Sequence, residues 1–311
     1  MRNVFMRLTL RQMQVFRAVC EHLSYSRAAE ELALTQPAVS LQIKQLEEII
    51  GQPLFEYVGK KLYLTDAAGF LFDTSSEIFQ QLSEMDMKLS NLLGSLSGDL
   101  KIAVESSAKY LSPHLIAAFQ KKYPDVHPYL RVFNRSQIIR RLVENRDDIV
   151  VMSMVPEDMA LEFMPFMNNP IVALCSPEHP LRHEESLEIK DLQSWPLLVR
   201  EAGSGTRKAC EEFFQQKRVQ FQTAMELNSQ EAQREAVIAG LGIALMPKHA
   251  VNRELVAGDL VVLPVKELPI FRSWCVVHAR GKRLSPVAQA FLNFIREERG
   301  VISQIGKRFG G

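Results

Sequence analysis

SRAAEEL at residues 26–32 and TQPAVSLQIKQLE at residues 35–47 decide how the N-terminal part of this chain folds. The small alanines of the first segment leave room for helices to cross closely. The second segment has an apolar face formed by Val39, Ile43 and Leu46, whose spacing is that of a helix. Two short helices joined by a tight turn, the second rich in small polar residues, are typical of a helix-turn-helix.

The ends of the second segment predict a helix over Gln36–Ile50. Thr35 is suited to cap this helix, because its hydroxyl can accept a hydrogen bond from a free backbone N–H. Pro37 falls in the first turn, where its missing N–H does no harm. Gly51 favours the C-terminal end, since glycine adopts the left-handed conformation easily.

Further elements are predicted around this helix, namely helices over residues 10–23 and 26–32 and short strands over residues 54–57 and 62–64. Ser24 or Ser26 can cap the helix over residues 26–32. Gly59, Lys60 and Lys61 lie between the two strands. A hairpin tip of this kind would place positive charge beside a DNA backbone, as a wing does.

Gln36, Ser40 and Lys44 recur every four residues, on a face of the predicted helix that is separate from the apolar one. Glutamine pairs with adenine in the major groove, serine with several base edges, and lysine with guanine or phosphate. A plain three-helix bundle is the alternative interpretation. The residues that we expect to contact DNA are Ser26, Thr35, Gln36, Pro37, Ser40, Lys44, Lys60 and Lys61.

Residues 66–97 predict one long helix with an apolar seam at heptad spacing, interrupted by Ser75. A seam sustained over about four heptads favours a coiled-coil contact between two copies of the chain. The alternative is a helix that lies on its own domain. The residues that we expect to form the dimer contact are Leu71, Ile78, Leu82, Met85, Leu89 and Leu92.

Residues 98–311 alternate between short apolar runs and helical patterns. Strands are predicted over residues 100–104, 129–133, 149–154, 171–176, 197–199, 243–246 and 274–279, and helices over residues 113–123, 137–145, 206–216, 230–239 and 286–299. Such alternation predicts an α/β fold with mostly parallel sheets. Interruptions near Pro170 and from Pro264 to Pro269 predict two α/β lobes between which the chain crosses twice.

Polar residues follow three of the predicted strands, over residues 105–110, 133–136 and 200–207. Strand-to-helix junctions expose backbone N–H groups that hold anions, and ligands of open α/β sheets bind beyond the carboxyl ends of the strands. A cleft between two lobes would bring these junctions together. The residues that we expect to contact a small-molecule effector are Ser106, Ser107, Lys109, Asn134, Arg135, Ser204, Gly205 and Thr206.

The composition narrows the classes of protein to which the chain can belong. The chain has 311 residues, of which 47% are hydrophobic and 23% charged, so it is globular and long enough for several domains. Four scattered cysteines without a C-x-x-C pair argue against a zinc site or disulfides. We predict no metal and no cofactor. Neither a secretory signal nor an apolar run of membrane-spanning length is present, so we expect a cytoplasmic protein without a membrane partner.

Two other classes of protein are weaker alternatives. The sequence contains no His-Glu-x-x-His, no nucleophile motif and no paired-carboxylate motif, so we predict no catalytic residues and no enzyme activity. A stand-alone solute-binding protein would need an export signal, and the first 97 residues would then have no role.

The strings quoted above, extended by residues 51–55 and 64–69, resemble the N-terminal signature of LysR-type transcriptional regulators. This resemblance covers nearly the whole chain. It implies a winged helix-turn-helix over residues 1–65, a dimerising linker helix over residues 66–97, and an effector domain over residues 98–311 that is similar to a periplasmic binding protein. The lobes of that domain would be residues 98–170 with 267–300, and residues 171–266.

Within the family, the chain is most similar to regulators of carbon-fixation (RuBisCO) operons. The segments that carry this resemblance are residues 59–65, 107–110, 156–158, 201–207 and 239–243. Regulators of that group respond to phosphorylated sugars and NADPH. This chain departs from them at Ser153, Met154 and Val155, where a Gly-Arg-Pro stretch would be expected and no cation is present.

The resemblance implies several partners. They are double-stranded promoter DNA, a small effector such as a phosphorylated metabolite or NADPH, a second copy of the chain in a homodimer or homotetramer, and RNA polymerase. A LysR-type regulator of amino-acid or aromatic-acid metabolism remains an alternative function.

Overall fold

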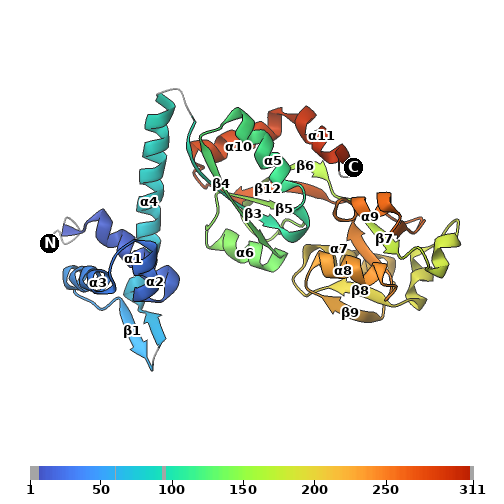
Figure 1. Ribbon diagram of the computed structural model, residues 1–311, viewed down its shortest axis with the longest axis horizontal. Helices are drawn as coiled ribbons and strands as arrows, with labels where there is room; N and C mark the ends of the chain where they lie inside the picture. Colours follow the sequence, from blue (N-terminus) through green and yellow to red (C-terminus); the bar gives the residue numbers. More distant parts are fainter. Residues whose placement is uncertain (1–6, 60, 93–95, 309–311) are drawn as a thin grey trace. The chain divides into compact units, whose positions relative to one another are not determined.

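The computed structural model of the chain describes residues 7–59, 61–92 and 96–308 (Figure 1). The chain divides into two compact units, Met1–Asp86 and Met87–Gly311. None of the described helices is both long enough and apolar enough to cross a membrane.

The first unit combines helices with one β-hairpin. Its elements are α1 (Leu10–His22), α2 (Tyr25–Glu31), α3 (Gln36–Ile50), β1 (Phe55–Val58), β2 (Lys61–Leu64) and α4 (Asp66–Leu92). The predicted bounds of α3 are confirmed, with Thr35 as its N-cap and Gly51 in the left-handed conformation at its end. Ser24 rather than Ser26 caps α2, since its hydroxyl accepts a hydrogen bond from the backbone N–H of Arg27.

The core of this unit lies where α1, α2 and α3 cross. Ala28 on α2 is fully buried, as small side chains at a close crossing should be. Phe16 of α1 and the apolar face of α3 pack around it, and Leu54 closes the core beneath the hairpin. Burying each large side chain of this kind contributes roughly 1.5–3 kcal/mol, so the apolar pattern of α3 determines how it is oriented.

The linker helix α4 is shorter than we predicted. It ends at Leu92, residues 96 and 97 are not helical, and Gly98 already begins the next strand. Ser75 is buried and its hydroxyl donates to the Phe72 carbonyl, which is how the helix accommodates a polar residue there. The guanidinium of Arg17 lies over the rings of Phe72 and Phe79. The N-terminal half of α4 therefore packs against α1.

The second unit contains two lobes. Lobe 1 consists of β3 (Gly98–Glu105), α5 (Ser112–Lys122), β4 (Val126–Phe133), α6 (Arg135–Val143), β5 (Ile149–Met152), β6 (Leu161–Asn168), β12 (Ser273–Ala279), α10 (Pro286–Glu297) and α11 (Arg299–Arg308). Lobe 2 consists of β7 (Ile171–Cys175), β8 (Leu197–Arg200), α7 (Gly205–Lys217), β9 (Thr223–Leu227), α8 (Gln230–Ile238), β10 (Ala244–Pro247), α9 (Asn252–Ala257) and β11 (Val261–Val262).

Lobe 1 is a five-stranded sheet of order β4-β3-β5-β12-β6 between two layers of helices (Figure 1). Phe119 of α5 packs edge to face against Phe291 and Phe294 of α10, over one side of the sheet. Ile138 and Leu142 of α6 cover the other side. The central strands β3, β5 and β12 are buried on both faces, which explains why they appear in the sequence as apolar runs.

Lobe 2 has the same layered design. Its strands β10-β7-β11 form one sheet, and the pair β8-β9 adjoins it through a parallel bridge between Leu197 and Ile243. Phe213 of α7 packs on one face of these strands. Val237 of α8 packs on the other.

The prediction of mostly parallel sheets is wrong. β12 runs antiparallel to β5 and β6, and β7 runs antiparallel to β10 and β11. The reason is the double crossing: β7 carries the chain out of lobe 1, and β12 brings it back, so each enters its sheet from the opposite end. The carboxyl ends of β3 and β8 are thereby directed to the contact between the lobes.

Candidate functional sites

The exposed face of α3 carries the residues that the sequence singled out for DNA contact. Thr35, Gln36, Pro37 and Lys44 are exposed, and Ser40 is half-buried. The Gln36 amide nitrogen donates to the Ser40 hydroxyl at 2.9 Å. These groups lie on one side of the helix, away from its buried apolar face, so they form a polar surface of the kind that reads base edges.

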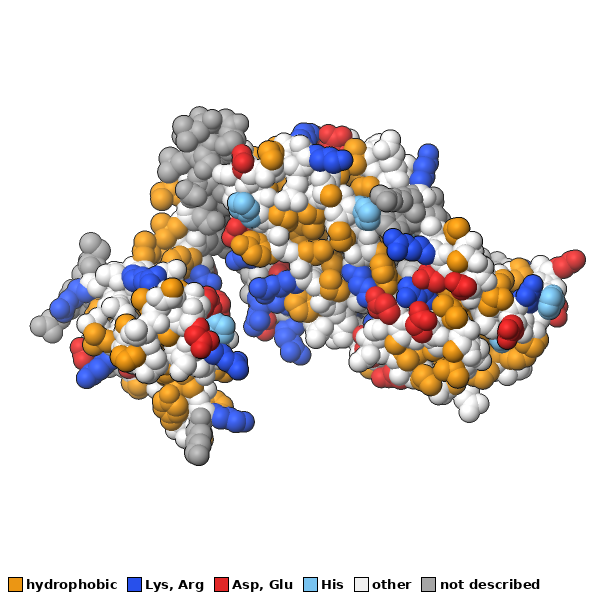
Figure 2. All heavy atoms as spheres, viewed as in Figure 1, with side chains coloured by type: hydrophobic (Ala, Val, Ile, Leu, Met, Phe, Trp, Pro, Cys, Tyr) orange, Lys and Arg blue, Asp and Glu red, His pale blue; other side chains and the backbone are white. Residues whose placement is uncertain are grey.

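The rest of the predicted DNA surface lies on α2 and on the hairpin. Ser26 is exposed on α2, Lys61 is exposed at the start of β2, and Lys60 lies outside the described residues. Tyr57 and Val58 are 67% and 61% exposed on β1. Figure 2 shows hydrophobic and basic side chains exposed at this hairpin.

Specific hydrogen bonds hold the hairpin against α3 and α4. A carboxylate oxygen of Glu47 on α3 accepts from the backbone N–H of Leu54 at 2.8 Å. The Thr65 hydroxyl donates to the Pro53 carbonyl at 2.8 Å and also accepts from the backbone N–H of Ala68 in the first turn of α4. The position of the hairpin relative to α3 is therefore set by side chains and does not depend on the tip.

The predicted dimer seam is only partly free along α4. Leu71 packs against the core of its own unit, which favours the alternative interpretation for the second turn of the helix. Ile78 and Leu82 are half-buried, and Met85 is 53% exposed. The side chains of Leu89 and Leu92 lie outside the described residues.

In the second unit, the two lobes contact each other at their strand-to-helix junctions. The backbone N–H of Ser136 in lobe 1 donates to the Gly203 carbonyl in lobe 2 at 3.1 Å. The hydroxyl of Tyr110 and the ammonium of Lys109 both bind the carboxylate of Glu231 on α8. The predicted junctions are therefore close together across the lobe contact.

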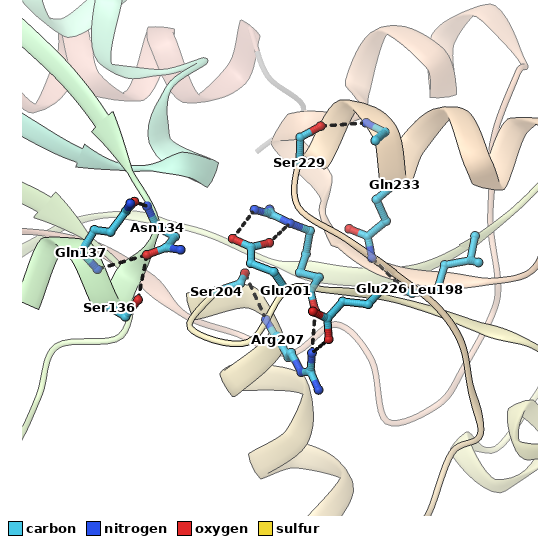
Figure 3. A network of polar contacts seen from close by, with 12 residues as sticks. Asn134, Ser136, Gln137, Leu198, Glu201, Ser204, Arg207, Glu226, Ser229 and Gln233 are labelled. Atoms are coloured by element: carbon cyan, nitrogen blue, oxygen red, sulfur yellow. Dashed lines mark hydrogen bonds and ion pairs between the residues drawn. The ribbon is translucent and has the colours of Figure 1, made fainter.

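Two helix N-termini face this contact. Asn134 caps α6, accepting hydrogen bonds from the backbone N–H of Gln137 and from the Ser136 hydroxyl. Ser204 caps α7 and is 2% exposed. Figure 3 shows the α6 terminus directed toward the turn that holds Glu201 and Ser204. Helix N-termini carry partial positive charge and free N–H groups, so this geometry suits an anion.

Charged groups that we had not predicted also reach the lobe contact. Glu105 at the end of β3 is 1% exposed, and one of its oxygens accepts from the N–H and hydroxyl of Ser153, at 2.8 and 3.0 Å. Burial raises the pKa of this carboxyl, against the hydrogen bonds from Ser153 and the smaller effects of Arg135 and Arg200. Arg200, at the end of β8, is 2% exposed and forms a bidentate pair with Glu201.

Several buried polar atoms near the lobe contact have no hydrogen-bond partner among the described residues. They are Oε1 of Glu105, Nη1 of Arg200, Oε1 of Gln233 and the side-chain amide of Gln230. More than nine in ten buried polar groups in proteins are paired. A concentration of unpaired groups at one place therefore indicates a surface that accommodates polar ligand atoms or water.

The other predicted effector residues lie at the same junctions. Ser106 is half-buried and Ser107 is 3% exposed in the short 3₁₀ turn after β3, and Thr206 is 5% exposed in the first turn of α7. Arg135 directs its Nε to the Met154 carbonyl at 2.8 Å. Gly205 contacts the Glu105 carboxyl, because a β-carbon placed there would lie 1.6 Å from Oε1.

One signal in the sequence could have identified the missed residues. Glu105 and Arg200 are charged residues that end apolar strands. A buried charge at such a position is costly unless it is paired and hydrogen-bonded, so its presence there indicates a functional site. Gln230, Glu231 and Gln233 gave no such signal, because a polar helix terminus is ordinary on a surface.

Lobe 2 also contains a cavity of about 490 Å³ beside α7 and β8. Phe214, Val219 and Phe221 form part of its apolar wall, and Arg200 and Gln233 contribute polar groups. Among the described residues, no group of three or more His, Cys, Asp or Glu side chains is placed to hold a metal ion.

Two sequence profiles match the chain. Residues 10–69 match the bacterial regulatory helix-turn-helix protein of the lysR family, and residues 93–300 match the LysR substrate binding domain. The first match lies within the first unit and the second match within the second unit.

Named relatives and a solved structure agree with these matches. The chain is 40% identical to the RuBisCO operon transcriptional regulator of Acidithiobacillus ferrooxidans, over 92% of this chain and 93% of that protein. It is 42% identical to the regulator of the same name from Allochromatium vinosum, over 94% and 97%. The CcmR regulatory domain of Synechocystis PCC6803 in complex with 2-PG is 36% identical, with a TM-score of 0.62, over 64% of this chain and 96% of that one.

Proposed function

The chain belongs to the LysR family of bacterial transcriptional regulators, and we propose that it controls a carbon-fixation operon in response to a small anionic metabolite. It is a DNA-binding protein with an effector domain, not an enzyme. The observation that carries the assignment to a RuBisCO operon is the identity of 40–42% to two regulators of such operons over more than nine-tenths of the chain.

We propose that α3 enters the major groove and that the hairpin follows the backbone beside it. Gln36, Ser40 and Lys44 read base edges or phosphates, and Lys60 and Lys61 contact phosphates next to them. The exposure of Gln36 and Lys44 supports this proposal. Ser26, Thr35 and Pro37, which adjoin the same surface, position the helix on the duplex.

We propose that the effector binds at the contact between the lobes and is a phosphorylated metabolite or NADPH. The capped N-termini of α6 and α7 support an anionic ligand there, as do Arg135 and Arg200. The complex of the related CcmR regulatory domain with 2-PG gives further support. Ser106, Ser107, Lys109, Asn134, Ser204, Gly205 and Thr206 are the remaining proposed contacts.

We propose that the cytoplasmic chain works as a homodimer joined through α4, or as a homotetramer, and contacts RNA polymerase at its promoter. Effector binding changes how the lobes close about the crossings near Pro170 and Pro264. That movement alters how the dimers pack and so the spacing of the DNA-binding helices. The ligand must bind one arrangement better than the other, or it would shift nothing.

The test is a mobility shift on the promoter of a RuBisCO operon, titrated with 2-PG, sugar phosphates and NADPH. We expect a shifted band whose mobility or affinity changes with one of these compounds. A shift that responds to none of them would contradict the effector class. The absence of any shift at low salt would contradict DNA binding itself, since phosphate contacts are strongest there.

A further inference from the structure

Glu105 is an acidic group at a site that otherwise suits anions. It ends β3 and is 1% exposed. Its Oε2 accepts two hydrogen bonds from Ser153, but its Oε1 is buried and finds no partner in the described part of the chain. One half of the carboxyl is therefore fixed, and the other half lacks a hydrogen-bond partner within the residues that the structure describes.

The available oxygen faces the first turn of α7. An ideal β-carbon on Gly205 would lie 1.6 Å from Oε1, so only glycine permits this approach. α7 is 13 residues long, and Ser204 caps it. The carboxyl thus occupies the positive end of a full-length helix, where an oxyanion of the ligand would also be favoured.

The charged groups around Glu105 come from three elements. Arg135 of α6 directs its Nε to the Met154 carbonyl, and Arg200 of β8 is paired with Glu201. Lys109, which follows β3 in the chain, is paired with Glu231 of α8. The cations near Glu105 are therefore already engaged, and none of them donates to Oε1.

We propose that Glu105 binds the effector as a neutral carboxyl, with its Oε1 hydroxyl donating a hydrogen bond to a phosphate or carboxylate oxygen held at the N-terminus of α7. The proposal rests on the effector function proposed above and names the oxyanion as the group that is recognised. An ionised Glu105 would repel that oxyanion. A neutral Glu105 can accept from Ser153 through Oε2 and donate to the oxyanion through Oε1.

A consequence is that effector binding takes up a proton wherever the pH lies above the pKa of Glu105 in the free protein. Burial raises the pKa of Glu105, and a neighbouring oxyanion raises it further, because like charges disfavour ionisation. The affinity then falls with rising pH, by up to about tenfold per pH unit above the pKa of the free protein. A ligand with an ammonium group would give the opposite trend, since it would require an ionised Glu105.

Calorimetric titration of 2-PG into the full chain tests the proposal. Binding heats in two buffers of unequal ionisation enthalpy, from about pH 6 to about pH 8, report the protons taken up. We expect Glu105→Gln, whose amide still donates, to bind 2-PG with less proton uptake, by at most one proton and with the difference largest at the highest pH. Glu105→Leu removes the donor and should lose about tenfold or more in affinity. Protons exchanged by 2-PG itself contribute equally in all variants, so they cancel when the proton uptakes of two variants are compared.

Glu185→Gln is the matched control, because it removes an exposed carboxyl in the same unit, away from the contact between the lobes. Its proton uptake should equal that of the unaltered protein. Equal uptake in Glu105→Gln and the unaltered protein at every pH, together with unchanged affinity in Glu105→Leu, would overturn the proposal, as would tighter binding at high pH. If the unaltered protein binds neither 2-PG nor sugar phosphates nor NADPH at any pH, the oxyanion class proposed for the effector is wrong, and the role of Glu105 falls with it.

Discussion

On α3, Gln36 and Ser40 lie one turn apart and bond to each other at 2.9 Å, whereas Glu105 and Gly205 meet only because two lobes fold together. The α3 surface is largely exposed, and Gln36 and Ser40 are paired with each other before any DNA binds. The lobe contact is buried and several of its polar atoms are unpaired within the described residues. The comparison suggests that α3 recognises its target by surface complementarity, and the lobe contact by completing unsatisfied groups.

The largest expected effect comes from placing charges in the dimer seam that we propose for α4, which should abolish DNA binding and leave the lobe contact intact. Met85→Glu combined with Leu89→Glu would place charges in the proposed seam of α4, where burial without partners is strongly unfavourable. We expect dissociation of the dimer in analytical ultracentrifugation and loss of promoter binding, while calorimetry still detects effector binding. Thr74→Glu, at an exposed position outside the seam, is the control. A dimer that persists would show that α4 is not the contact.

The next effect concerns the lobe contact. Gly205→Ala would force the new methyl group against Glu105 Oε1, so either the carboxyl or α7 must move. Overpacking of this kind costs about 1–3 kcal/mol, and we expect the effector affinity to fall while DNA binding without effector is kept. Gly300→Ala is the control, since open space surrounds that position. Unchanged effector affinity in Gly205→Ala would place the ligand elsewhere.

On α3 the expected effect is of similar or smaller size and appears only as specificity. Gln36→Ala removes the proposed base contact and the bond to Ser40, with a loss of about 1–3 kcal/mol of discrimination between operator and unrelated DNA. Competition mobility shifts measure the ratio of the affinities for operator and unrelated DNA. Gln45→Ala, exposed on the same helix, should leave it unchanged. Equal loss of affinity for all sequences would instead assign Gln36 to the phosphate backbone.

The smallest effect concerns the ion pair between the lobes. Although burial opposes it, hydrogen bonds from Lys109 and Tyr110 lower the pKa of Glu231 to about 2. The lowered pKa of Glu231 stabilises the folded state at pH values above 4.5, the ordinary pKa of the group. This stabilisation is lost as the pH falls toward about 2. The carboxylate is 43% exposed, so we expect Glu231→Gln to cost less than about 1 kcal/mol at neutral pH. Denaturant unfolding measures this loss in the free energy of unfolding, with Glu235→Gln as the control.

The same contrast explains what could be predicted from the sequence. The bounds of α3 follow from Thr35, Pro37 and Gly51, which act within one turn of the helix ends. The antiparallel strands could not be anticipated, because their direction depends on where the chain crosses between lobes. β9 was missed since nearly every residue in it is exposed and it shows no apolar alternation.

The candidate sites divide in the same way. The polar face of α3 follows from the spacing of residues within one helix, so it was predicted residue by residue. At the lobe contact, the junctions were predicted from their glycines and hydroxyls. The pairing of Glu105 with Ser153 and Gly205 was not predicted, because nothing in the sequence indicates which distant residues will surround a buried carboxyl.

The central claim is that a ligand at the lobe contact changes how the paired α3 helices engage DNA. DNase footprinting on the RuBisCO operon promoter, with and without 2-PG, tests this claim most directly. We predict a protected region whose length or internal cleavage pattern changes when 2-PG is added to the unaltered protein, and changes less in Gly205→Ala. Identical footprints at saturating 2-PG, for a protein that calorimetry shows to be occupied, would contradict the account.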